Sequence, residues 1–347
     1  MRILRGAPAA FAVAMVSLAP AGAEQSTHAN INTVEIGDFI GTVIIETARR
    51  SDVRLDNRSG ALADYPVRIS AENGVLTIRS DEDPDDTRWW DDVNWRRYEG
   101  KAFEEFLKDY PTLTLTIPAG AALAFDSAVV RLDAGDTNGA LSVREGHVDG
   151  VIGDIASGDI KIHGSGDLKT GAVAGPLNIS IYGSGDFEAL AAASLNTSIN
   201  GSGDIKIGAI GGDVEAGIHG SGDILLGDID GAMIASIKGS GDIHADRVSG
   251  GAAVSIYGSG DIAVASVNGE TTARIHGSGD IDIRDGRAEN LRVAIHGSGG
   301  FDFGGLATNP DIEADSSGDV RIRRHEGSVR ARGDGDIRIS GIQYGDD

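Results

Sequence analysis

Residues 219–243 read HGSGDILLGDIDGAMIASIKGSGDI, and this stretch decides the fold because the corner Gly-Ser-Gly-Asp returns in it after nineteen residues. The corner recurs along the chain with steps of eighteen or nineteen residues, and its aspartates are Asp167, Asp186, Asp204, Asp223, Asp242, Asp261 and Asp280. Weaker copies follow at Gly300, Asp319 and Asp336. One glycine corner per short repeat is typical of a β-solenoid.

Aligned repeats place apolar residues in columns. One column precedes the corner and one follows it: Ile181, Ile199, Ile218, Ile237, Ile256, Ile275 and Ile295, then Phe187, Ile205, Ile224, Ile243, Ile262, Ile281 and Phe301. A third apolar position recurs at Ile210, Ile229, Val248 and Val267. Around each column apolar and polar residues alternate, which is the period of strands with one buried face. The sequence therefore predicts an all-β fold, a parallel β-helix of about ten turns with three short strands in each turn.

The corner itself has a predicted geometry. We expect its two glycines to adopt positive φ values, which a sharp turn between short strands requires and which glycine adopts at low cost. The aspartate that ends the corner is expected to cap its own turn by accepting backbone hydrogen bonds.

The chain before the repeats is less regular. Strands are predicted at 31–45, 67–78 and 113–117. An insertion at 81–110 carries all three tryptophans, Trp89, Trp90 and Trp95, and its residues 101–109 have the spacing of a short amphipathic helix. Because uncapped solenoid ends expose apolar core and strand edges, we expect this insertion to cap the first turn, with a ligand-binding loop as the alternative.

The first residues have the pattern of an export signal. Arg2 and Arg5 precede an apolar, alanine-rich run that ends in small residues, so residues 1–23 are predicted to be a signal peptide. The expected domains are then an N-terminal β region at 24–125 and a β-helix at 126–347, without a transmembrane segment after cleavage. We expect a periplasmic, cell-surface or secreted protein, which has no cysteine to form a disulfide.

Tandem Gly-Ser-Gly-Asp-Ile units after a signal peptide, preceded by Leu-Thr-Leu-Thr-Ile-Pro-Ala-Gly at 113–120, resemble a bacterial family. It is the family described as putative auto-transporter adhesin, head GIN domain, and the likeness covers roughly residues 120–340. The resemblance implies a β-helix outside the cytoplasmic membrane and a role in adhesion. No catalytic residues come with it.

Two rows of side chains are candidate sites. An outward row before the corners combines aromatic and hydrogen-bonding groups and could bind an extended glycan: His163, Tyr182, Asn200, His219, Lys238, Tyr257, His276 and His296. The alternative is a solvated strand position. The repeated aspartates could hold calcium between turns, but one carboxylate per nineteen residues lacks the fuller ligand set of calcium-binding repeats, so no cofactor and no metal site are predicted.

The sequence favours a binding protein over an enzyme. It contains no Gly-x-Ser-x-Gly elbow, no His-Glu-x-x-His motif and no phosphate loop. A formal charge of −23 argues against nucleic acid as a partner, and the C-terminal arginines are expected to balance nearby acids. We predict a non-catalytic adhesion module that binds an extracellular glycan or another envelope component. The alternatives are a structural or self-associating envelope protein without a specific ligand, and a calcium-binding repeat protein.

Overall fold

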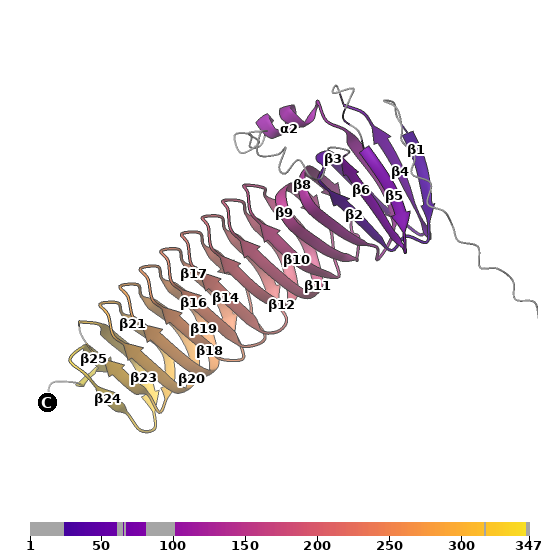
Figure 1. Ribbon diagram of the computed structural model, residues 1–347. Helices are drawn as coiled ribbons and strands as arrows, with labels where there is room; N and C mark the ends of the chain where they lie inside the picture. Colours follow the sequence, from indigo (N-terminus) through magenta and orange to yellow (C-terminus); the bar gives the residue numbers. More distant parts are fainter. Residues whose placement is uncertain (1–23, 61–64, 66, 81–100, 316, 345–347) are drawn as a thin grey trace, which may run out of the picture.

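The computed structural model describes residues 24–60, 65, 67–80, 101–315 and 317–344. The chain is all-β, with 67% of residues in strands and 2% in helix, and it winds into a β-solenoid of about 11 turns. Figure 1 shows a long rod whose turns stack from the N-terminal end to the C-terminal end. The predicted parallel β-helix is therefore confirmed. At one strand spacing per turn, 11 turns correspond to a rod roughly 50 Å long.

The repeat region consists of long strands, which span most of a turn, and of shorter ones, which span part of a turn. Its strands are β8 (Ala122–Ala134), β9 (Ala140–Ile152), β10 (Ser157–Ile162), β11 (Leu168–Ile181), β12 (Phe187–Ile199), β13 (Ile205–Ile210), β14 (Val214–Ile218), β15 (Ile224–Leu226), β16 (Met233–Ile237), β17 (Ile243–Val248), β18 (Ala252–Ile256), β19 (Ile262–Ile275), β20 (Ile281–Ile295), β21 (Phe301–Thr308), β22 (Asp311–Ala314), β23 (Asp319–Glu326), β24 (Arg330–Arg332), β25 (Asp336–Ile339) and β26 (Ile342–Tyr344).

Each turn pairs in parallel with the turns on either side. After the corner, Ile205 is level with Ile224, which is level with Ile243. Before the corner, Ile218 is level with Ile237. The third apolar position forms isolated parallel bridges or short ladders, as between Ile210 and Ile229. All three predicted columns are buried, with members 0–2% exposed, so each turn encloses a strip of a continuous apolar core.

The corner glycines have a different reason from the predicted one. Among the described residues, the glycines with positive φ lie outside the Gly-Ser-Gly-Asp corners. A Cβ built on the first glycine of a corner, such as Gly239, would lie 1.9 Å from the carbonyl oxygen of Gly220 in the preceding turn. On the second glycine, such as Gly241, it would lie 2.0 Å from the oxygen of Gly222. The expectation of positive φ was wrong: glycine is required because the corners stack backbone on backbone.

The N-terminal turns stack out of sequence order. Their elements are β1 (Glu24–Ala29), β2 (Thr33–Gly37), β3 (Ile40–Ala48), β4 (Asp52–Arg58), β5 (Val67–Glu72), β6 (Val75–Ser80), α2 (Lys101–Leu107) and β7 (Thr112–Pro118). Strands β2 and β3 form a turn between β8 on one side and β6 with β7 on the other. Beyond that outer turn, β5 pairs antiparallel with β6 and β4 pairs antiparallel with β7, and β1 is added to β4. The antiparallel strands therefore close this end of the parallel stack.

The predicted helix near 101–109 is present as α2, and it lies on the side of the solenoid (Figure 1). Phe103 and Leu107 are buried against Ile40 of β3 and Val129 of β8. Phe103 also meets the ring of His147 of β9, with ring centroids 4.5 Å apart. The insertion was expected to cap the first turn, but its described part covers the flank of three successive turns. The tryptophans lie outside the described residues.

The C-terminal turns end in a short hairpin. Strand β26 folds back antiparallel on β25 and completes the last turn. Arginines of these turns pair with acids: Arg332 with Glu313 at 2.7 Å, Arg338 with Asp336 at 2.9 Å and Arg321 with Asp302 at 3.5 Å. The contact with Arg332 lowers the pKa of Glu313. These pairs agree with the expectation that the C-terminal arginines balance acids. Within the described part of the chain, no helix has the length and apolarity needed to cross a membrane.

Candidate functional site

The corners stack into one edge of the rod, which we call the corner ridge. It consists of three parallel rows. The first is the outward row from His163 to His296 given above, which we call the ring row although it includes Asn200 and Lys238. The second is formed by the serines of the corners, and the third by the aspartates that end the corners. All eight members of the ring row are exposed, and most of the serines and aspartates are exposed as well. Because each row advances by one strand spacing per turn, the ridge presents the same three groups at intervals of roughly 4.8 Å.

The aspartate row is tied to the backbone of the neighbouring turns. The backbone N–H of Asp186 donates to Oδ1 of Asp167 at 2.9 Å, and the same bond recurs from turn to turn up to Gly300, which donates to Asp280 at 2.6 Å. The intervening members are Asp204, Asp223, Asp242, Asp261 and Asp280, at 2.7–2.8 Å. Each aspartate thus caps the corner of the following turn rather than its own. Hydrogen bonds to a charged acceptor are among the stronger ones in proteins.

The ring row is partly stacked on itself. The rings of His163 and Tyr182 are 4.8 Å apart and 11° from parallel, and those of Tyr257 and His276 are 4.8 Å apart and 12° from parallel. The facing sides of these rings are therefore covered by their neighbours. The ridge offers solvent the ring edges, with their nitrogen and hydroxyl groups, so this surface suits hydrogen bonding better than stacking on an aromatic face.

The ring row ends at an acid. His276 and His296 have ring centroids 5.2 Å apart, and Nδ1 of His296 lies 3.4 Å from Oδ2 of Asp315 in the next turn. Among the residues that the structure describes, no group of three or more histidine, aspartate or glutamate side chains is arranged to hold a metal ion. The arrangement at His296 is a surface ion pair when the imidazole is protonated.

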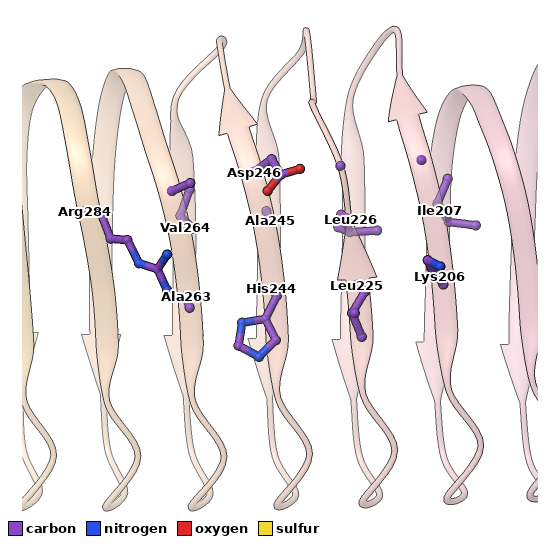
Figure 2. A pocket seen from close by; sticks show the side chains of 13 residues that line it. Lys206, Ile207, Leu225, Leu226, His244, Ala245, Asp246, Ala263, Val264 and Arg284 are labelled. Atoms are coloured by element: carbon purple, nitrogen blue, oxygen red, sulfur yellow. The ribbon is translucent and has the colours of Figure 1, made fainter.

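A shallow groove of about 380 Å³ runs over another face of the rod, across the turns between Lys206 and Arg284. We call it the flank groove. Figure 2 shows Leu225 and His244 on successive turns at its centre, with Arg284 reaching across toward Ala263. Two outward columns line it: one consists of Lys206, Leu225, His244 and Ala263, and the other of Gly208, Gly227, Asp246, Ala265 and Arg284.

The groove is a local break in a charged column. On the N-terminal side, Glu188 bridges Lys169 at 3.0 Å and Lys206 at 3.2 Å, and these two lysines hold the pKa of Glu188 below its ordinary value. The next residues of the column are Leu225, 41% exposed, then His244 and Ala263. Three turns in succession therefore place no carboxylate, lysine or arginine in that column.

The sequence predicted the ridge rows and missed the groove. Both rows follow from a strictly repeated corner, so alignment of the repeats finds them. The groove depends on residues that do not repeat. The second residue after each corner aspartate changes from Lys206 to Leu225, then to His244 and to Ala263. The signal that could have found it is the loss of charge along this one column.

A family model described as "Putative auto-transporter adhesin, head GIN domain" matches residues 32–227, 191–285 and 229–342. Together these matches cover most of the chain, including the N-terminal turns that stack out of order. No curated protein sequence matches this chain.

Three solved structures resemble this chain. A putative adhesin from Bacteroides fragilis NCTC 9343 is 15% identical, with 89% of this chain and 95% of the other covered and a TM-score of 0.33. A putative adhesin from Parabacteroides distasonis ATCC 8503 is 15% identical, with 81% and 96% covered and a TM-score of 0.37. A putative lipid binding protein from the same organism is 14% identical, with 89% and 96% covered and a TM-score of 0.24.

Proposed function

The chain belongs to the family described as putative auto-transporter adhesin, head GIN domain, and from this premise we propose that it is a non-catalytic binding module displayed outside the cytoplasmic membrane. Its corner ridge is the proposed contact surface, and a component of the bacterial envelope or an extracellular glycan is the proposed partner. The observation that carries the proposal is the exposed ring row, which repeats hydrogen-bonding groups over eight corners at one-turn intervals.

The physical basis is that different rows of the ridge have different roles. The aspartate Oδ1 atoms are occupied by backbone N–H groups of the next turn, so this row contributes to the stability of the rod. The ring edges and Lys238 remain available to a partner. Weak contacts repeated along a rigid surface add up, because the ordering cost is met once for the whole rod rather than once per contact.

The proposed location follows from the chain's first segment and from the family. The family indicates an envelope or exported protein. We propose the finer statement that residues 1–23 are removed on export. Strand β1 begins at Glu24, so cleavage there would leave the described fold whole.

A pull-down with the purified chain tests the proposed function. The immobilised chain is incubated with a solubilised envelope fraction and with a glycan panel. The ridge variant carries Tyr182→Ala, His219→Ala, Tyr257→Ala and His276→Ala together. The matched control carries alanine at four exposed or half-exposed outward positions of another face, Asn196, Glu215, Ile234 and Thr272.

We expect the wild-type chain and the control to retain the same component and the ridge variant to lose most of it, with melting temperatures alike in all three. Recovery of nothing but the chain itself would reject the binding role and favour a structural protein. Equal retention by the ridge variant would move the contact surface elsewhere on the rod.

A further inference from the structure

We propose that the flank groove between Lys206 and Arg284 is a binding site for an extended, uncharged oligosaccharide. The inference rests on the binding role proposed above, but it concerns a different face of the rod from the corner ridge. It therefore has its own test.

The groove has a floor that can receive the apolar face of a sugar ring. Gly208 and Gly227 leave the backbone bare, and both must stay glycine: a Cβ would lie 2.1 Å from the oxygen of Leu190 at Gly208 and 2.5 Å from the oxygen of Gly208 at Gly227. Ala265 continues this low column, and Leu225 supplies exposed apolar surface beside it. Pyranose rings have apolar C–H faces. Burial of such a face against Leu225 and the bare backbone lowers the free energy of binding.

The rim carries the polar groups that hydroxyls need. Lys206, His244 and Arg284 offer donors at every second turn along the groove, and Asp246, in the same column as Arg284, offers an acceptor. Figure 2 shows Arg284 extended over the neighbouring turn toward Ala263, which places its guanidinium along the groove rather than away from it. A charged side chain hydrogen-bonded to a hydroxyl forms a stronger bond than a neutral pair does, and adjacent hydroxyls can share one guanidinium.

The charge of the molecule selects against an acidic polymer. The chain carries a formal charge of −23, so its long-range field repels a polyanion. The rim mixes both signs, and Lys206 is already paired with Glu188. An uncharged ligand avoids the repulsion and uses donors and acceptors alike. The groove is open and floored by backbone, so it does not enclose an acyl chain as lipid sites do.

The length of the groove sets the size of the ligand. From the turn of Lys206 to the turn of Arg284 there are four steps of one strand spacing, or roughly 19 Å. An extended sugar unit is about as long as one strand spacing, so this distance holds about four units. Affinity should therefore rise with chain length up to about four or five units and then level off.

The test is calorimetric titration of the full purified chain with uncharged oligosaccharides of two to eight units, drawn from β-linked glucans, mannans and N-acetylglucosamine oligomers. Polygalacturonate serves as the acidic comparison. The variant is Leu225→Ser, and its matched control is Val151→Ser, an exposed residue of the same outward column outside the groove. Both changes are at the surface, and melting temperatures check that the fold is kept.

We expect at least one uncharged series to bind with the predicted dependence on length. Leu225→Ser should weaken it about tenfold or more, while Val151→Ser leaves it unchanged. The inference is overturned if no uncharged series binds, if polygalacturonate binds instead, or if both serine variants behave alike. Should the groove fail in this way while the ridge variant still loses the envelope component, the proposed function stands without the groove.

Discussion

Each corner glycine lies where two successive turns approach closely, so the addition of one methyl group there tests the stacking. Gly239→Ala would place a Cβ against the backbone of Gly220, which no side-chain movement can relieve. We expect it to destabilise the fold by about 1–3 kcal/mol or more, as other overpacked substitutions do. Chemical denaturation of the purified variant measures the change.

The control for this substitution is Gly135→Ala. No atom lies within 4 Å of a Cβ at Gly135, and its φ is not in the left-handed region. The added methyl group should leave stability unchanged or raise it slightly, because alanine lowers the entropy of the unfolded chain. Equal losses at Gly135 and Gly239 would show that close stacking is not the reason for the corner glycines.

The aspartate row makes a second prediction for single residues. Asp242→Ala removes the acceptor of the Asp261 N–H and should cost about 1–2 kcal/mol, because that donor loses its partner at a crowded corner. Asp242→Asn keeps an oxygen at the same place and should cost clearly less. Thermal melting of both variants gives the comparison, and equal losses for asparagine and alanine would mean that the charge rather than the hydrogen bond matters.

For single residues, the sequence predicted which positions are buried or exposed better than it predicted why glycine and aspartate are needed at the corners. The buried columns, the exposed ring row and the aspartate row all follow from the repeat. Two reasons could not be read from one turn alone, because they involve the next turn: the Cβ clash at Gly239 and the bond from the Asp261 N–H to Asp242. A local rule for glycine or aspartate describes a single chain segment and is blind to a neighbour nineteen residues away.

Among the elements, helix α2 packs against a buried histidine. His147 is 2% exposed beneath Phe103, and burial lowers its pKa to about 4 from an ordinary value of 6.5. The neutral ring is therefore favoured in the folded state. Its contribution is fully present above pH 6.5 and is lost as the pH falls from 6.5 toward 4, because the unfolded chain takes up a proton that the folded chain does not.

We expect the melting temperature to fall between pH 7.5 and pH 5, and His147→Leu to remove part of that fall. The part assigned to His147 in this range corresponds to about 2 kcal/mol. The pKa of His28 is also lowered by burial, so the part of the fall that comes from His28 should remain in the His147→Leu variant. An unchanged profile in His147→Leu would contradict the assignment.

The sequence predicted which elements exist better than it predicted the order in which they stack. Strands at 67–78 and 113–117 and the helix near 101 were predicted and are present, although the first of these segments is a hairpin turning at Asn73 and Gly74. Strands β1 and β4 were missed. That β2 and β3 lie between β8 and the later turn of β6 and β7 follows from long-range pairing, for which no local pattern in the chain is a guide.

For the whole molecule, the continuous core predicts that a buried charge acts beyond its own turn. Ile224 is fully buried, and Ile224→Asp should cost several kcal/mol and unfold several turns together, since each turn is stabilised by its neighbours. Hydrogen exchange should show lost protection in the adjoining turns. Ile234→Asp, the same change at a 55% exposed position, should leave protection nearly as it is.

We propose that the repeated Gly-Ser-Gly-Asp corner is structural, that it leaves the exposed surfaces for binding, and that the rod needs no specific cation. Stacked carboxylates one strand spacing apart repel each other by about 0.9 kcal/mol per pair in bulk water, and dissolved salt screens this repulsion without coordinating to the chain. The bonds from the aspartate Oδ1 atoms to the next turn offset it locally.

The direct measurement is the melting temperature of the purified chain in Ca²⁺ and in Mg²⁺ at equal ionic strength, accompanied by calorimetric titration of Ca²⁺. We expect similar melting temperatures in the two salts, both above that in low salt, and no stoichiometric uptake of Ca²⁺. A rise specific to Ca²⁺, with about one ion bound per turn, would contradict it and make the solenoid a calcium-binding repeat protein.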